Sequence, residues 1–264
     1  MTLVNILIRP RRVFYPNLII SLDKNMPEIS KQNSQIEANL IRVIETLRTL
    51  EIKYQRPANS VELLAVSKTK PIKDIFAAST AGQKHFGENY VQEAIEKIEA
   101  LQLNKPALRW HFIGPIQKNK TRLIAEHFQW LHSLDRLVIA QRLNDQRPNS
   151  LPPLQVCIQV NIDNEVSKAG VKTEDIQGLA ESISKLEHIK LRGLMAIPQA
   201  SSDTGKQRES FANLRKQLEH LNQDGFSLDT LSMGMSGDLE AAIAEGTTIV
   251  RVGTAIFGKR SAKT

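Results

Sequence analysis

Two lysines, Lys68 and Lys70, follow a short apolar run near the start of the predicted fold. The run from Leu63 to Val66 is continuous, and Pro71 ends the segment because proline has no N–H for a strand ladder. Such a run is typical of a buried strand in a parallel sheet, and ligands bind at the carboxyl ends of these strands. Apolar surroundings disfavour a charged lysine and favour the free amine that forms a Schiff base. Alternation along the strand predicts that both lysines point inward, and solvated strand-end lysines are the alternative.

Two glycine-rich segments close to the C-terminus have the composition of an anion-binding site. They are SMGMSGD at residues 232–238 and RVGTAIFG at residues 251–258. Their glycines and hydroxyl residues are Gly234, Ser236, Gly237, Gly253 and Thr254. Glycine lets backbone N–H groups approach an anion, hydroxyls add donors, and a helix starting after Ser236 would direct its positive end to the same place. Ordinary turns, with Ser236 as a helix N-cap, are the alternative for each residue taken singly.

Short apolar segments alternate with helical patterns from residue 27 onward. We expect strands within residues 61–70, 84–87, 109–114, 130–135, 154–163, 189–197, 228–234 and 248–258. A helix at 27–50 precedes the first strand, and a helix follows each of the first seven strands. No pair of strands is joined by an Asn-Gly or Asp-Gly hairpin, which favours a parallel sheet. Eight such units match an α/β fold of the (β/α)8 TIM barrel type; a doubly wound open sheet is the alternative, although no GxGxxG motif opens its first helix.

Barrel closure would place the lysines beside the glycine-rich segments, because the eighth strand then pairs with the first. The loops after the seventh and eighth strands of such barrels frequently bind phosphate. A lysine for an aldehyde and amides for a phosphate describe pyridoxal 5′-phosphate, although class I aldolases also combine a barrel lysine with phosphorylated substrates. Arg251 favours the cofactor, because at the end of the eighth strand it could donate a hydrogen bond, but no proton, to the pyridine nitrogen. A neutral ring is a poor electron sink, which suits a racemase-like or non-catalytic site better than a transaminase.

Six segments of the sequence resemble one family. They are LLAVSKTKP (63–71), HFGENYVQE (85–93), WHFIGPIQKNK (110–120), LRGLMAIP (191–198), SMGMSGDLEAAIAEG (232–246) and RVGTAIFGKR (251–260). Together they closely resemble the pyridoxal-phosphate homeostasis proteins of the YggS/PROSC type, over about residues 27–260. The resemblance implies a barrel like the N-terminal domain of alanine racemase. Two departures are the N-terminal extension and Gly237, where an acidic residue is common in the family.

The same resemblance assigns roles to particular residues. It implies that the cofactor is attached to Lys68 and that Arg251 faces the ring nitrogen. The implied phosphate contacts are Ser236, Gly253 and Thr254. It also implies that Asn89 is a pocket residue, where local sequence alone predicts a helix cap. Lys70 and Lys168 are candidates for weaker, secondary attachment.

The resemblance leads us to expect a carrier rather than an enzyme. Alanine racemases place a tyrosine from a second, β-rich domain opposite the lysine, and this sequence ends at Thr264, directly after the eighth strand. Its tyrosines are Tyr15, Tyr54 and Tyr90, of which Tyr90 alone follows a strand on the ligand side. The expectation is a non-catalytic protein that binds the cofactor reversibly, protects its aldehyde and releases it to apo-enzymes. A low-activity amino-acid racemase is the alternative, and a class I aldolase is a remote one.

Composition predicts one cytoplasmic domain preceded by an extension. A chain of 264 residues with 41% apolar and 24% charged residues has an ordinary globular composition. Residues 1–26 are expected to lie outside the fold, either as an extension or because translation starts at Met26, and residues 27–264 to form the barrel. Cys157 lies alone in an apolar strand, which predicts a buried, inert thiol in a reducing compartment.

Neither a nucleic-acid nor a membrane partner is indicated. The net charge of +7 is partly due to the first residues, and no basic run with interleaved aromatics predicts a nucleic-acid surface. No apolar run is long enough to span a membrane. The histidines His85, His111, His127 and His132 have no metal-ligand spacing, so we expect packing or surface roles for them and no metal. We expect a monomer because no coiled coil appears.

Overall fold

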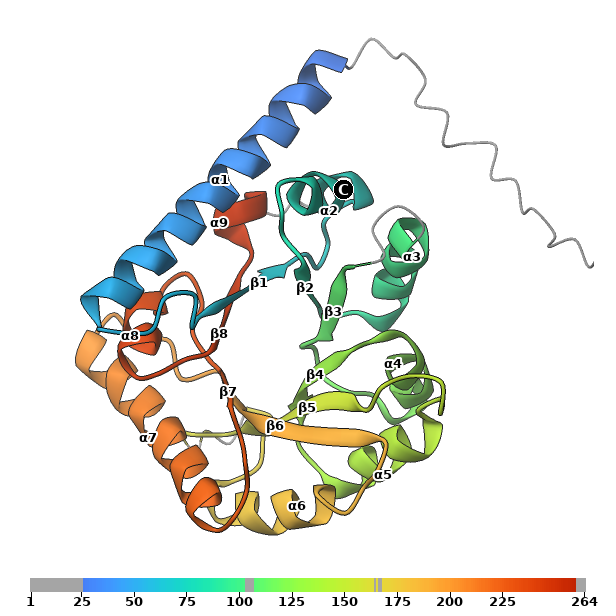
Figure 1. The fold of residues 1–264 in the computed structure, drawn as a ribbon, viewed down its shortest axis with the longest axis vertical. Coiled ribbons are helices and arrows are strands. Elements are labelled where there is room, and N and C mark those ends of the chain that lie inside the picture. The colour runs from blue at the N-terminus through green and yellow to red at the C-terminus, as the bar shows by residue number, and fades with distance from the viewer. Residues whose placement is uncertain (1–25, 103–106, 164, 166–167, 260–264) are drawn as a thin grey trace, which may run out of the picture.

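A closed barrel of eight parallel strands forms the centre of the protein (Figure 1). The computed structural model describes residues 26–102, 107–163, 165 and 168–259. The strands are β1 Glu62–Val66, β2 His85–Glu88, β3 Arg109–Phe112, β4 Trp130–Leu134, β5 Leu154–Val160, β6 Ile189–Ala196, β7 Thr230–Ser232 and β8 Ile249–Val252. Each strand pairs in parallel with the next along the chain, and β8 pairs with β1. The predicted (β/α)8 barrel is therefore confirmed, and the open sheet is excluded.

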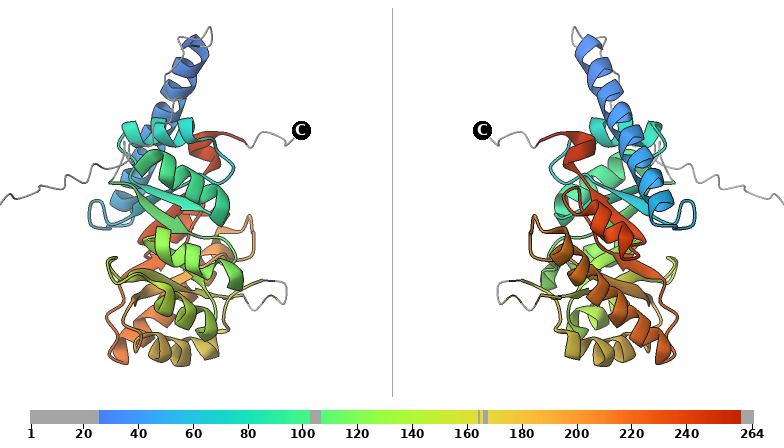
Figure 2. Two further views of the ribbon diagram at one scale, coloured as in Figure 1. Left: turned by 90° about the vertical axis from the view of Figure 1, so that its right-hand side faces the viewer. Right: turned by 90° about the vertical axis from the view of Figure 1, so that its left-hand side faces the viewer.

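Helices surround the barrel on its outside (Figure 1). They are α1 Met26–Lys53, α2 Ile72–Thr80, α3 Val91–Gln102, α4 Thr121–His127, α5 Leu137–Gln146, α6 Ile176–Ile183, α7 Thr204–Gln223, α8 Leu239–Ala244 and α9 Thr254–Phe257, with short 3-10 turns at Lys118–Lys120 and Thr173–Asp175. Figure 2 shows α1 along one side of the barrel, projecting past it at the N-terminal end of the helix. Helix α1 packs against α2, α8 and α9, so it covers the seam where the barrel closes. The expected extension, apart from Met26, lies outside the described residues.

The apolar core lies mainly between the strands and the surrounding helices. Helix α1 contributes Ile36, Leu40, Val43 and Leu47, which are buried at the spacing of one helical face. Cys157 on β5 is 0% exposed, and burial raises the pKa of its thiol to about 12, which confirms the predicted buried thiol. No helix within the described ranges is long and apolar enough to cross a bilayer.

The interior of the barrel, in contrast, is partly polar. The side chain of His132 on β4 bonds to Ser232 on β7, and Arg251 on β8 bonds to the carbonyl of Ala196 on β6. Neither pair belongs to neighbouring strands, so both bonds cross the inside of the barrel. The four residues are all buried. Polar side chains therefore link strands that the backbone ladder does not connect.

The close approach of β6 and β7 requires a glycine at position 193. A Cβ at Gly193 would overlap with the carbonyl oxygen of Thr230, whereas a Cβ at Gly178 on α6 would meet nothing within 4 Å. We predict that Gly193→Ala lowers the free energy of unfolding by about 3 kcal/mol, because the strands must separate. Gly178→Ala should raise it by about 0.5–1 kcal/mol, since alanine favours the helix. Urea unfolding of both variants tests this, and equal effects would contradict it.

Candidate functional site

A cavity of about 320 Å³ opens at the carboxyl end of the barrel. We refer to it as the carboxyl-end cavity, and its size is within the range of small-molecule sites. It is lined by residues that follow or end β1, β2, β3, β6, β7 and β8. The structure brings together all six residues predicted to hold a ligand: Lys68, Asn89, Ser236, Arg251, Gly253 and Thr254. Residues far apart in the sequence thus form one site.

The pairing of β1 with β8 sets the position of Lys68 in this cavity. Leu64 lies opposite Arg251 and Ala65 opposite Val252, so both strands end at the same level. The next residue of β8's loop, Gly253, lies so close to β1 that an added Cβ would be 3.0 Å from the carbonyl oxygen of Val66. A larger residue would push the two loops apart. The glycine therefore keeps the lysine loop beside the glycine-rich loop.

Lys68 and Lys70 lie in the turn after β1 and not on the strand itself, as the alternation had predicted. Strand β1 ends at Val66, and Thr69 has a φ of 63°, so the strand alternation does not continue to Lys70. Lys68 and Lys70 nevertheless both line the cavity. Lys70 Nζ donates to the carbonyl oxygens of Phe257, Gly258 and Lys259 at 2.9, 3.0 and 3.0 Å. It therefore fixes the C-terminal end of α9, where a cation is favoured.

A buried ion pair holds the segment that carries Lys68. Lys97 on α3 is 3% exposed, and its Nζ lies 2.7 Å from Glu88 Oε1 and 2.5 Å from Glu93 Oε1. Lys97 also donates to Ser67 O at 2.8 Å, and Ser67 Oγ donates to Glu88 Oε1 at 2.6 Å. Glu93 Oε1 in turn accepts from the N–H of Thr69 at 2.6 Å. The residues on both sides of Lys68 are therefore fixed by one charged cluster.

Sequence reasoning missed this cluster. Glu93 and Lys97 have the spacing of an ordinary surface pair on a helix. The available signal was that Lys97 shares a helical face with the buried Ala94 and Leu101. Burial raises the pKa of the Glu88 carboxyl and the charge of Lys97 lowers it, with burial the larger effect.

Arg251 is buried at the floor of the cavity with its charge satisfied by backbone oxygens. Nη1 donates to Ser232 O at 2.5 Å and to Ser232 Oγ at 3.0 Å, and Nη2 donates to Ala196 O at 2.9 Å. Burial lowers the pKa of the guanidinium to about 10, so it remains charged at neutral pH. Among the described residues these are its side-chain hydrogen bonds, and a guanidinium has five N–H groups. Donors therefore remain for a ligand in the cavity.

Ser236 and Thr254 lie at the rim, where each is exposed. Thr254 is the first residue of α9, with Gly253 as its N-cap. Ser236 is not an N-cap, because α8 begins after Asp238. Asp238 Oδ1 accepts from the N–H of Met235 at 2.5 Å, and burial raises the pKa of this carboxyl. The Ser236 hydroxyl is therefore not needed to cap α8.

Asn89 lies in the cavity rather than at a helix cap. Helix α3 begins at Val91, two residues further on. The Oδ1 atom of Asn89 is buried and accepts no hydrogen bond from the described residues. A buried carbonyl oxygen without a donor is costly, so a ligand that donates to it would be stabilised. Lys168 lies in an adjacent cavity that shares Ile197 with this one, and it pairs with Glu165.

The chain matches the family model for the N-terminal domain of alanine racemase over residues 39–261. It is 54% identical over 227 residues to a pyridoxal phosphate homeostasis protein of Pseudomonas aeruginosa, covering 86% of this chain and 96% of the relative. The corresponding Vibrio cholerae protein is 52% identical over 227 residues, with 85% and 96% covered. The chain belongs to the family of pyridoxal phosphate homeostasis proteins. The resemblance found in the sequence motifs is thereby confirmed.

Solved structures agree with this assignment. PipY of Synechococcus elongatus, determined with PLP bound, is 37% identical with a TM-score of 0.73, and the match covers 85% of this chain and all of PipY. A protein of unknown function from Bifidobacterium adolescentis is 34% identical with a TM-score of 0.81, covering 86% and 96%. Alanine racemase of Corynebacterium glutamicum, at 15% identity and a TM-score of 0.66 over 88% of this chain and 63% of that one, shares the fold.

We predict that the buried cluster around Lys97 contributes strongly to stability. Lys97→Met leaves the carboxylates of Glu88 and Glu93 without their positive partner and the carbonyl of Ser67 without its Lys97 donor, so the free energy of unfolding should fall by about 3–5 kcal/mol. The control is Arg122→Met, which removes an exposed pair with Glu126 and should cost less than about 1 kcal/mol. Urea unfolding measures both. If the two variants lose similar amounts of unfolding free energy, the buried cluster does not stabilise the segment around Lys68 as predicted.

Proposed function

We propose that this protein binds pyridoxal 5′-phosphate through a Schiff base with Lys68 and acts as a non-catalytic carrier that buffers the cofactor. The observation that carries the proposal is the shared cavity in which Lys68, the loop after β8 and the buried guanidinium of Arg251 meet. The amine of Lys68 would condense with the aldehyde of the cofactor, with loss of one water molecule. Because hydrolysis reverses this bond, the cofactor can also be released.

The residues of the cavity suit the chemical groups of this cofactor. Ser236 and Thr254 supply hydroxyls. The backbone N–H groups of Thr254 and Ala255, the first two residues of α9, have no acceptor within the helix, so these groups would hold the phosphate. The Oδ1 atom of Asn89, which is buried and accepts no hydrogen bond from the described residues, would accept one from a donor of the cofactor. The narrow approach between Gly253 and Val66 would keep the phosphate contacts beside Lys68. The PLP-bound PipY structure supports this assignment by similarity.

Arg251 favours storage over electron withdrawal. When bound, the cofactor supplies an aldehyde for amines and a ring that withdraws electrons most strongly with its nitrogen protonated. The guanidinium would donate a hydrogen bond to that nitrogen and would keep its own proton, because its pKa is about 10 even when buried. The ring nitrogen would remain unprotonated. This environment suits a bound reserve of the cofactor.

A second base is the feature that a racemase would need. Tyr54 donates to Glu240 at 2.8 Å beside α8, and neither Tyr54 nor Tyr90 lines the carboxyl-end cavity. Lys70 lines it, but its ammonium group is committed to three carbonyl oxygens of α9 and the residues after it. Within the described residues, no tyrosine therefore faces Lys68 across the cavity. The names of the relatives, which are homeostasis proteins, support the carrier over the low-activity racemase.

Apo-enzymes that need the cofactor are the proposed recipients. Reversible attachment would keep the reactive aldehyde from other amines until a recipient takes it. The cytoplasmic location, the monomeric state and the role of residues 1–26 stay predictions.

We predict that the purified protein shows an absorbance band of a pyridoxal Schiff base after addition of the cofactor, and that Lys68→Ala loses this band. Lys73→Ala removes an exposed lysine of α2 and should keep it. Incubation with L-alanine followed by chiral analysis should leave the amino acid unchanged. Formation of D-alanine would establish the racemase instead, and a band that survives in Lys68→Ala would show that another lysine is the attachment site.

A further inference from the structure

A series of hydrogen bonds connects the cofactor-site arginine to the opposite end of the barrel. Arg251 Nη1 lies 3.0 Å from Ser232 Oγ, which lies 2.7 Å from His132 Nδ1. His132 Nε2 is 2.9 Å from His111 Nδ1, and His111 Nε2 is 3.0 Å from His85 Nδ1. We call these five residues the histidine network. They come from β8, β7, β4, β3 and β2, so the network crosses the barrel interior.

The network is buried at one end and open at the other. Ser232, His132 and His111 are at most 1% exposed, and the His111 ring stacks on Trp130 with an angle of 7° between the planes. The side chain of His85 is 25% exposed. It lines a second cavity of about 300 Å³ at the amino-terminal end of the strands, which we call the amino-terminal pocket. His85 is therefore the member of the network whose ring is in contact with solvent, whereas the rings of His111 and His132 are buried.

With all three rings neutral, Arg251 and Ser232 favour one direction for the hydrogen bonds of the network. Because a guanidinium only donates, Ser232 Oγ accepts from Arg251, and its hydroxyl hydrogen is free to donate to His132 Nδ1. His132 then carries its proton on Nε2 and donates to His111 Nδ1. His111 likewise donates from Nε2 to His85 Nδ1, which leaves the His85 Nε2–H directed toward Glu62, 3.7 Å away. With all three rings neutral, each donor in the interior has an acceptor.

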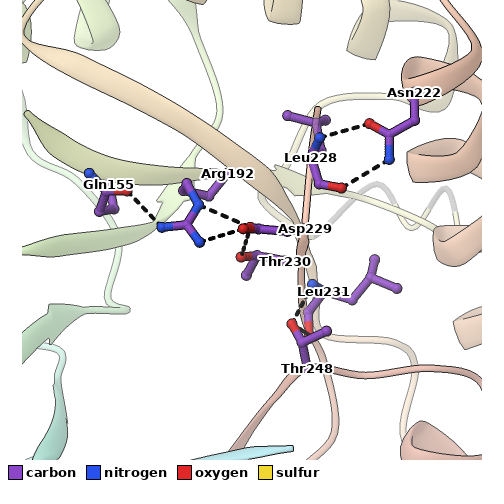
Figure 3. A network of polar contacts seen from close by, with 8 residues as sticks. All are labelled: Gln155, Arg192, Asn222, Leu228, Asp229, Thr230, Leu231 and Thr248. Atoms are coloured by element: carbon purple, nitrogen blue, oxygen red, sulfur yellow. Dashed lines mark hydrogen bonds and ion pairs between the residues drawn. The ribbon is translucent and has the colours of Figure 1, made fainter. Parts of the chain in front are cut away.

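The other wall of the amino-terminal pocket is already neutralised. Arg192 contacts both carboxylate oxygens of Asp229, at 2.9 and 2.6 Å, and Gln155 Oε1 at 2.8 Å (Figure 3). The guanidinium of Arg192 also lies 5.0 Å from the ring centre of Trp130. Arg192 and Asp229 are therefore paired with each other. Of the two histidines that line the pocket, His111 is buried and His85 is partly exposed, 3.7 Å from Glu62, and histidine is the side chain that changes its charge most readily near neutral pH.

A proton taken up by His85 would reverse the network. Protonated His85 carries hydrogen on both ring nitrogens, so its Nδ1–H must meet a lone pair on His111 Nε2. His111 and His132 must then hold their single protons on Nδ1, and His132 Nδ1–H points at Ser232 Oγ. The rings together gain the one proton that came from water. The hydroxyl hydrogen of Ser232 thereby loses its acceptor beside Arg251, which weakens the arrangement that holds the guanidinium.

We propose that Ser232, His132, His111 and His85 are positioning residues for Arg251, and that proton uptake at His85 lowers the affinity of the carboxyl-end cavity for its cofactor. The statement about affinity rests on the proposed function, whereas the direction of the network does not. Binding and protonation oppose each other, so the bound cofactor would equally disfavour a proton on His85. Because proton uptake at His85 lowers the affinity, the protein would release more cofactor as the pH falls.

The charges around the network agree with rings that are neutral at pH 7. Burial is the largest cause that lowers the pKa of each ring, to about 3 for His132, well below the usual range for His111 and less for His85. Arg251 on β8 and the His85 ring act in the same direction on His132, and the rings of His132 and His85 together with Arg109 do so on His111. Glu62 on β1 raises the pKa of His85, and Arg109 on β3 and Lys84 before β2 lower it. The first proton thus enters at His85 as the pH falls below about 6.5.

The experiment compares cofactor dissociation constants of the wild-type protein and His85→Gln as a function of pH. Glutamine can accept from His111 and donate toward Glu62, but it takes up no proton. Because titration of the cofactor itself cancels in the ratio of the two constants, we expect that ratio, wild type over variant, to rise about fivefold from about pH 8 to about pH 5.5. His127→Gln, a histidine of α4 outside the network, should follow the wild type. A ratio that stays constant would overturn the proposal.

Two further measurements separate this inference from the proposed function. Nitrogen-15 NMR of the ligand-free protein should show His111 and His132 protonated on Nε2 at high pH and on Nδ1 once His85 titrates. Nδ1 protonation at high pH would overturn the network direction even if no cofactor binds. His111→Phe keeps the stacking on Trp130 and interrupts the network, so it should abolish the extra pH dependence. Failure of the wild-type protein to bind pyridoxal phosphate would instead refute the proposed function.

Discussion

The pairing of β8 with β1 is the constraint on which the site depends. Lys68 and the segment from Ser236 to Thr254 are far apart in the sequence, and the closed barrel places them side by side. The pairing of Leu64 with Arg251 sets the register of β1 and β8, so that both strands end at the same level of the barrel. Gly253 allows the loop after β8 to approach the end of β1 closely. Helix α1 packs over the same region through α2, α8 and α9. A change that opened this seam would separate Lys68 and Asn89 from Ser236, Arg251, Gly253 and Thr254.

Closure also creates the problem of a buried charge. Arg251 is 5% exposed, and an arginine in such a place requires acceptors for its N–H groups. Ser232 and Ala196 provide them from β7 and β6, and Ser232 in turn requires the histidines. The polar interior is therefore one connected consequence of placing a guanidinium at the floor of the cavity. Most of the remaining core, between strands and helices, is apolar and independent of this chemistry.

The strand–helix alternation predicted the barrel, and two sequence motifs predicted Lys68, Ser236, Arg251, Gly253 and Thr254 as members of the cavity, because each is a local pattern. Asn89 was expected there only from the family resemblance. Lys97 and His132 show what local patterns omit. Lys97 has the spacing of a surface ion pair, but in the fold its ammonium group is buried against Glu88 on β2 and the carbonyl of Ser67 after β1. His132 is expected to pack or face solvent because the histidines have no metal-ligand spacing, and its hydrogen-bond partner Ser232 lies 100 residues away in the sequence, beyond the reach of a local pattern. The short β1 likewise depends on the tight turn at Thr69 rather than on its apolar run.

Covalent attachment to Lys68 is the central claim, and trapping the bond tests it most directly. The protein would be mixed with pyridoxal phosphate, reduced with borohydride, digested and analysed by peptide mass spectrometry. The account predicts that the reduced pyridoxyl group is found mainly on the peptide containing Lys68, with at most minor labelling of Lys70 or Lys168. Predominant labelling elsewhere, or cofactor that binds without becoming trapped, would contradict it.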